Sequence, residues 1–151
     1  QIQDLAINSL IKKAIKTIEI ERRQVEKYSK KDLENLILSA SKNLGTDKTG
    51  LKSLLERNNL NYDELVNKFK VDLKWNSMIF DIYKNKISLN TVEIENKLNL
   101  AVKNIKEGEN REKRIEEIKQ NIVFQEKNKK LQMFSNSHYS NLERVIQIKF
   151  L

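Results

Sequence analysis

The chain has 151 residues, which is enough for one domain with a buried core. It contains no proline, no cysteine and only three glycines, so helices are favoured throughout, and disulfides, thiol catalysis and cysteine-bound metals are excluded. The net charge is +8, but acidic residues are interspersed along nearly the whole chain, so the positive field is modest.

A first helix is predicted over residues 2–27. Apolar side chains at helical spacing form one face: Ile7, Leu10, Ile11, Ala14, Ile15, Ile18 and Val25. Glu19, Glu21, Arg22 and Arg23 fall outside this face, and we expect them to meet solvent. One side of this helix is therefore predicted to pack on a core.

Two shorter helices are predicted next. Ser29, with Asp32 three residues later, has the spacing of a helix start. Gly45 suits the left-handed residue that follows a helix end. A loop over residues 46–50 then leads into a short helix with three leucines and two closing asparagines: Leu51, Leu54, Leu55, Asn58 and Asn59.

A long central helix is predicted over residues 61–87. Asn61 and Glu64 form a capping pair at its start. One apolar row holds Leu65, Phe69, Leu73, Phe80 and Tyr83. A second apolar row holds Val71, Trp75, Met78 and Ile82. A helix that is apolar on two sides has to be surrounded by other helices or has to keep one side for a partner.

The C-terminal part is predicted as two helices and a strand. A cap around residues 88–91 starts a helix that reaches about residue 105, and residues 107–110 are a candidate hinge. A long helix follows over residues 111–136, and the β-prone residues 145–150 indicate a short strand. Such a strand needs a neighbour, which would be a segment before the first residue, another copy of the chain, or a client.

Three stretches carry a family resemblance. They read LAINSLIKKAIKTIEIERRQVEKYS, SKKDLENLILSASKNLG and LKSLLERNNLNYDELVNKFKVDLKWNSMIFDIYKNKISLNTVEIENKL, and together cover roughly residues 5–98. In this order they resemble the N-terminal domain of the SurA family, periplasmic chaperones of outer-membrane proteins in Gram-negative bacteria. The resemblance implies an all-α bundle with a long central helix, a long C-terminal helix and a short C-terminal strand. It divides the chain into a helical domain over residues 1–104 and a helix and strand over residues 105–151 that pack on it.

The resemblance also has one departure. SurA relatives usually carry parvulin-type prolyl isomerase domains between these helical parts, whereas only residues around 104–110 occupy that position here. The resemblance therefore implies a chaperone, not an enzyme, that uses no cofactor and works in the periplasm after removal of a signal peptide. The implied partners are unfolded or nascent outer-membrane polypeptides.

Other function classes have little support in the sequence. His138 is the single histidine, and no cysteine or Ser-His-Asp spacing accompanies it, so neither catalysis nor a metal site is expected. Lysines cluster on the two long helices, which leaves nucleic-acid binding as a weaker alternative. Acidic residues share those helices, however, and no DNA-binding motif is present. No apolar run is long enough for stable membrane insertion.

The two apolar rows of the central helix lead to the function prediction. We expect an ATP-independent chaperone that holds unfolded or extended polypeptides in an apolar groove between the central and C-terminal helices. The candidate peptide-binding residues are Val71, Trp75, Met78, Ile79, Ile82, Tyr83, Phe124, Leu131 and Phe134. Such residues are more often core than ligand contacts. The alternative is a self-associating structural module, a homodimer formed by exchange of terminal segments.

Overall fold

The computed structural model describes residues 2–103, 105, 108 and 110–146, with side chains from Asp4 onward. This part of the chain is helical and contains no strand, which confirms the all-α prediction. The elements are α1 (Ile2–Arg22), α2 (Lys30–Asn43), α3 (Lys48–Arg57), α4 (Tyr62–Tyr83), the short 3-10 helix η1 (Lys84–Lys86), α5 (Thr91–Val102) and α6 (Arg111–Val145).

The helices belong to two compact units. The first unit comprises the described residues within 1–81 and 139–151, and the second comprises those within 82–138. The predicted boundary near residue 104 falls inside the second unit.

Polar side chains start the helices where the sequence predicts. The Ser29 hydroxyl accepts a hydrogen bond from the Asp32 backbone N–H at 3.1 Å, and the Asn61 side chain accepts one from the Asp63 N–H at 2.8 Å. The third helix begins earlier than predicted, because Asp47 accepts from the Gly50 N–H at 2.7 Å and caps a helix that starts at Lys48. The predicted loop over residues 46–50 is therefore wrong beyond residue 47.

Three helices end in the same hydrogen-bonded motif. Each has one residue with positive φ just after the helix: Gln24 (φ 55°), Gly45 (φ 67°) and Asn59 (φ 55°). In each, the N–H of the next residue donates to a carbonyl five positions back, as Leu60 does to Leu55 at 2.9 Å. The prediction for Gly45 is confirmed. The predicted end of the first helix near residue 27 is wrong, because the motif at Gln24 ends α1 at Arg22.

The last helix is longer than predicted and replaces part of the predicted strand. α6 continues to Val145, and residues 147–150 of the predicted strand lie outside the described residues. No glycine or proline interrupts residues 111–145, so the helix can extend once started. Tyr139 also fixes this end, because its ring meets the Trp75 ring edge-on with 6.5 Å between the centroids.

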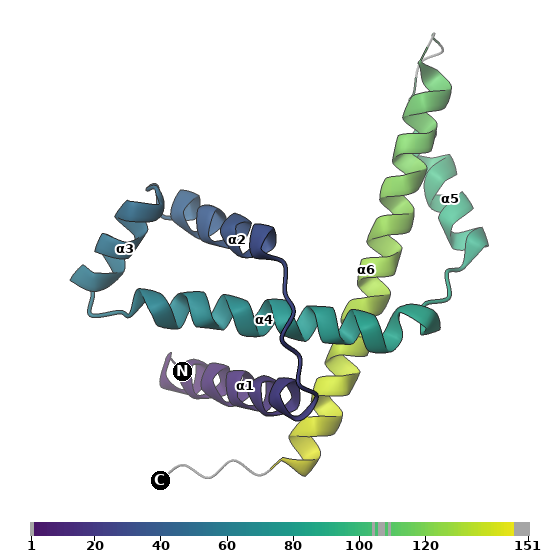
Figure 1. Ribbon diagram of the computed structural model, residues 1–151. Coiled ribbons are helices and arrows are strands. Elements are labelled where there is room, and N and C mark those ends of the chain that lie inside the picture. The colour runs from purple at the N-terminus through teal and green to yellow at the C-terminus, as the bar shows by residue number, and fades with distance from the viewer. Residues whose placement is uncertain (1, 104, 106–107, 109, 147–151) are drawn as a thin grey trace. The chain divides into compact units, whose positions relative to one another are not determined.

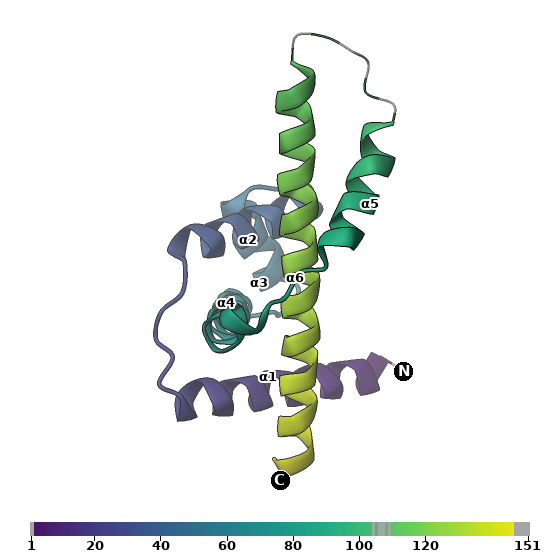
Figure 2. The same cartoon turned by 90° about the vertical axis from the view of Figure 1, so that its right-hand side faces the viewer.

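The first unit has a core centred on α4. Figure 1 and Figure 2 show α4 running between α1 and α2. The buried apolar side chains of this unit are Ile15, Ile20, Ile37, Leu51, Val71, Trp75, Met78 and Ile79. Half of them lie on α4, so this helix supplies more buried apolar side chains than any other helix of the unit.

The orientation of α1 differs from the sequence prediction. Glu19 is only 1% exposed, whereas Leu10 and Ile18 of the predicted apolar face are exposed. Arg22 donates two hydrogen bonds to the Glu19 carboxylate, at 2.7 and 2.8 Å, and Arg23 donates another. These hydrogen bonds and the carboxylate charge raise the pKa of Arg22. The prediction that Glu19 faces solvent is wrong, because two guanidinium groups compensate for burial of its charge.

The second unit consists mainly of α5 and the larger part of α6. α5 runs alongside α6 in both views (Figure 1 and Figure 2). Asn90 accepts hydrogen bonds from the N–H groups of Val92 and Glu93 and so starts α5. Ile94 is the buried apolar residue of α5. The Lys97 ammonium of α5 donates a hydrogen bond to the Glu126 carboxylate of α6.

Candidate functional site

Four of the nine predicted peptide-binding residues lie in the core of the first unit. Val71, Trp75, Met78 and Ile79 are buried, and Trp75 is only 1% exposed. The Lys16 ammonium lies over the Trp75 ring, 5.6 Å from the ring centroid, in a cation–π contact. The structure gives all four a packing role, and a peptide would reach them only if the helices separated.

The other five predicted residues lie in the second unit. The Tyr83 and Phe134 rings stack with 4.7 Å between their centroids and an interplanar angle of 6°. The Tyr83 hydroxyl is also 2.8 Å from His138 Nδ1 and forms a hydrogen bond with it. Ile82 and Leu131 are half-buried, and Phe124 is 64% exposed. Of the five, the structure brings Tyr83 and Phe134 into contact.

The two apolar rows of α4 have different surroundings. The row that contains Trp75 forms core, apart from the half-buried Ile82. In the other row, Leu65, Phe69 and Leu73 are half-buried and Phe80 is exposed. The less covered row therefore borders the open surface of the first unit, where its residues help to line two hollows.

An apolar hollow of about 270 Å³ lies between α1, the end of α3 and the start of α4. We call it the leucine hollow because four leucines line it: Leu10, Leu55, Leu60 and Leu65. Leu10 is 59% exposed and Leu60 is 56% exposed. The motif that ends α3 places Leu60 directly after Asn59, and the Asn61 cap starts α4 next to it. The turn that carries Leu60 is thus fixed by hydrogen bonds at both ends.

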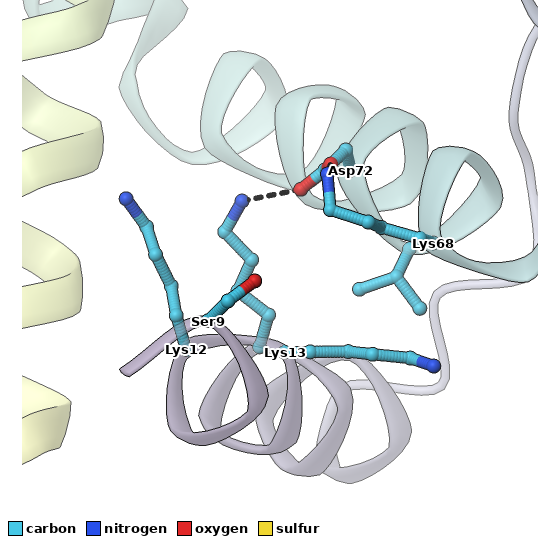
Figure 3. Close-up of a pocket in the computed structure, with 7 residues that line it drawn as sticks. Ser9, Lys12, Lys13, Lys68 and Asp72 are labelled. Carbon is cyan, nitrogen blue, oxygen red and sulfur yellow. Dashed lines mark hydrogen bonds and ion pairs between the residues drawn. The ribbon is translucent and has the colours of Figure 1, made fainter. Parts of the chain in front are cut away.

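A second hollow, of about 230 Å³, lies between α1 and α4 and is mainly basic. We call it the lysine hollow because Lys12, Lys13, Lys16 and Lys68 line it. Ser9, Val71 and Asp72 complete the lining. Figure 3 shows Lys12 and Lys13 extending from α1, and Lys68 and Asp72 from α4. The α1 residues are spaced three and four apart, so they share one face of that helix.

One carboxylate faces the four ammonium groups of the lysine hollow. Lys16 Nζ lies 2.6 Å from Asp72 Oδ1, and Lys68 Nζ lies 3.5 Å from Asp72 Oδ2. Lys12 Nζ is 5.6 Å from the Tyr139 ring centroid. In the described part of the chain, neither Lys12 nor Lys13 forms an ion pair. The hollow therefore carries an excess of positive charge that is available to an anionic group.

Two further hollows are less suited to a defined ligand. One, of about 480 Å³, has a mixed lining that includes Tyr28, Asp32, Leu73 and Phe80. The other, of about 260 Å³, is lined by α6 alone around Val123 and Phe124. A surface formed by a single helix offers a ligand contact on one side only. The leucine and lysine hollows are lined by more than one helix and have a mainly apolar and a mainly basic lining, respectively, so they are the better candidates.

The described part of the chain also bears on metal binding and on membrane insertion. Within residues 2–103, 105, 108 and 110–146, no three His, Cys, Asp or Glu side chains come together in a way that could hold a metal ion. None of the helices in this part of the chain combines the length and the apolar character needed to cross a bilayer.

Sequence reasoning missed both hollows. Ser9, Lys12, Lys13 and Lys16 follow the spacing of one helix face, so a basic row on the first helix was detectable. Its partner on the fourth helix was not detectable, because the pairing of Lys16 with Asp72 joins residues 56 positions apart. The leucine hollow likewise depends on how α1 packs beside the α3–α4 turn.

Comparisons with known proteins give no family assignment. No family model, no curated protein and no solved structure matches the chain. Function is therefore inferred from the geometry of the hollows together with the resemblance in the sequence.

Proposed function

We propose that the protein is an ATP-independent chaperone module that binds short unfolded or extended polypeptide segments in the leucine hollow. The observation that carries this proposal is the exposure of Leu10 and Leu60, which remain more than half exposed at the mouth of an apolar hollow. Exposed apolar surface that is gathered in one concave site favours binding of another apolar group.

The size of the leucine hollow suits side chains of a polypeptide. Its volume of about 270 Å³ is below the roughly 300–1,000 Å³ of pockets that enclose drug-sized ligands. One or two apolar side chains would fill it, each contributing about 1.5–3 kcal/mol by leaving water. Much of that gain is offset by the entropy lost on association. Binding would be weak and tolerant of sequence, as a chaperone requires.

The sequence resemblance to the SurA family supports the same function. It implies that the protein works in the periplasm and that unfolded outer-membrane polypeptides are its clients. The nine predicted peptide-binding residues can be revised with the structure in hand. Leu10 and Leu60 replace the buried residues around Trp75 as the contacts that a client would reach first.

The proposal is tested by suppression of aggregation of an unfolded outer-membrane protein. We compare wild type with the double variant Leu10→Ser and Leu60→Ser. The matched control is Leu5→Ser and Leu44→Ser, which changes one leucine of the same helix and one leucine at another helix end. Leu44 is 54% exposed and does not line the leucine hollow. We expect wild type and control to protect the client and the hollow variant to lose most of its protection.

Two results would count against the proposal. If wild type at several-fold excess gives no protection, the protein is not a chaperone. If the Leu10 and Leu60 variant protects as well as wild type, polypeptides do not bind in the leucine hollow.

A second candidate function is self-association through the second unit. Large apolar side chains are exposed on both of its helices: Val92, Leu100, Phe124 and Met133. Contact between copies would remove them from water and would make the protein an assembly module. Light scattering across a dilution series tests this. A dimer that dissociates after Phe124→Ser supports it, and a monomer at all concentrations contradicts it.

A further inference from the structure

The leucine hollow and the lysine hollow are neighbours on one surface. Ser9, Lys13 and Lys68 line both of them. In Figure 3, Lys13 extends away from Asp72, as expected for a side chain that also borders the leucine hollow. We call the two hollows together the α1–α4 surface. It presents an apolar part and a basic part side by side to the same ligand.

The charge balance of this surface is positive. Four lysines line it, and the carboxylates that face them are Asp72 and Glu64, both on α4. Asp72 compensates mainly for Lys16, because Lys16 Nζ lies closer to the Asp72 carboxylate than Lys68 Nζ does. Lys12 and Lys13 are left as cations without an ion pair in the described part of the chain. An incoming carboxylate would therefore meet ammonium groups that are not already neutralised.

We infer that the α1–α4 surface selects polypeptide segments in which an Asp or Glu lies next to large apolar side chains. This inference rests on the proposed function and adds a preference for one class of client. The apolar side chains would occupy the leucine hollow. The carboxylate would lie between Lys13, which has no ion pair in the described part of the chain, and Lys68, whose Nζ is 3.5 Å from Asp72 Oδ2 and so pairs less closely with Asp72 than Lys16 does. Because these two lysines border both hollows, one short segment can reach both parts of the surface.

The composition of the two hollows favours a polypeptide over a free inorganic anion. A phosphate ion would use the lysines alone and leave Leu10 and Leu60 exposed to water. The basic groups are all lysines, which act as flexible point charges, and no arginine supplies the bidentate geometry that suits phosphate. A ligand that carries both an apolar group and a carboxylate gains from both parts.

The test is fluorescence anisotropy with the full chain and three labelled peptides that differ only in the residue at the acidic positions. The first contains Leu, Phe and Glu, the second has Gln in place of Glu, and the third has Lys. We expect the Glu peptide to bind about tenfold more tightly than the Gln peptide at low salt, and the Lys peptide to bind most weakly. Raising the salt to about 0.5 M should reduce the preference, because it screens exposed charges.

Variants assign the preference to the two shared lysines. Lys13→Gln with Lys68→Gln should bring the Glu and Gln peptides to within about twofold of each other. Lys42→Gln with Lys48→Gln removes the same charge at exposed positions outside the hollows and should keep the tenfold preference. Circular dichroism checks that all variants remain helical.

The outcomes separate the inference from the proposed function. If the three peptides bind equally well, the selectivity is absent while the polypeptide-binding function stands. If no peptide binds, the proposed function itself fails. If inorganic phosphate displaces the Glu peptide as effectively as unlabelled Glu peptide does, the lysines form a general anion site and the inference is overturned.

Discussion

Lys16 Nζ lies 2.6 Å from Asp72 Oδ1 and connects α1 with α4 at the lysine hollow. The same ammonium lies 5.6 Å from the centroid of the Trp75 ring, which is part of the core. A cation in this position contacts an aromatic face on one side and a carboxylate on the other. Lys16 is therefore a structural lysine, whereas Lys12 and Lys13 on the same helix are available to a ligand.

Replacing Asp72 with Asn should weaken the fold slightly and strengthen binding of acidic peptides. Lys16 would lose its carboxylate partner, at a cost of about 1 kcal/mol in the free energy of unfolding. The lysine hollow would also lose its one negative charge, so affinity for the Glu peptide should rise about two- to threefold at low salt. Urea unfolding and anisotropy measure the two effects, with the exposed Glu34→Gln as control. Weaker binding by Asp72→Asn would contradict the assignment of the hollow.

Replacing Trp75 with Ala should strongly destabilise the first unit. The ring is buried against Tyr139 and Lys16, so its removal leaves a cavity in the core. A loss of about 3–5 kcal/mol is expected in urea unfolding. Phe80→Ala, on the less covered row of α4, should cost much less. Equal costs for the two variants would show that Trp75 is not core.

Replacing Glu19 with Gln should reveal the importance of its two arginine partners. The change keeps the volume of the side chain but removes the charge that accepts from Arg22 and Arg23. Because charge-assisted hydrogen bonds to a buried carboxylate are strong, we expect a loss of about 1.5–3 kcal/mol in the free energy of unfolding. Glu21→Gln on the exposed side of α1 should change it by less than about 0.5 kcal/mol. An unchanged unfolding midpoint for Glu19→Gln would contradict this account.

Most helix ends were predictable from the sequence because they depend on local chemistry. Ser29 and Asn61 start their helices through side chains that reach N–H groups two or three residues on. Gly45 ends a helix because it adopts positive φ without steric cost. The end at Gln24 was missed because a glutamine there gives no comparable signal.

Features that depend on distant residues were not predictable. Glu19 is buried although it is charged, and the sequence alone does not show that α1 turns this side inward. The candidate peptide-binding residues included the row of α4 that contains Trp75. The structure buries that row apart from the half-buried Ile82, and the other row borders the hollows. Periodicity identified both apolar rows, but which row the other helices cover is decided by tertiary packing.

The pairing of α5 with α6 should depend on pH. Hydrogen bonds to Glu126 and Glu93 raise the pKa of Lys97, and the Lys97 ammonium lowers the pKa of Glu93. Because the pKa of Glu93 is lower in the folded state, the ionised Glu93 carboxylate stabilises the fold at pH values above the pKa that Glu93 has in the unfolded chain. This contribution is lost as the pH falls through the pKa that Glu93 has in the folded protein. Because the pKa of Lys97 is higher in the folded state, the Lys97 ammonium stabilises the fold at pH values below the pKa that Lys97 has in the unfolded chain. This contribution is lost as the pH rises through the pKa that Lys97 has in the folded protein.

The ion pairs of Lys97 should therefore be most stable between roughly pH 5 and pH 10; the pair with Glu93 lies within α5, and the pair with Glu126 connects α5 with α6. NMR titration of the Glu93 carboxyl in wild type and in Lys97→Met tests the coupling. We expect the Glu93 pKa to return towards its ordinary value in the variant, and the part of the acid-induced loosening of α5 that depends on this ion pair to disappear. The same Glu93 titration curve in both proteins would contradict the prediction.

The most direct test of the central claim is site-specific cross-linking to a bound client. The chain has no cysteine, so a single cysteine can replace Leu60 or, as the control, Leu44 and carry a photoreactive group. With an unfolded outer-membrane protein, we expect cross-links from position 60 that excess unlabelled client suppresses, and few from position 44. Equal cross-linking from both positions, or none from position 60, would show that the leucine hollow does not bind polypeptides.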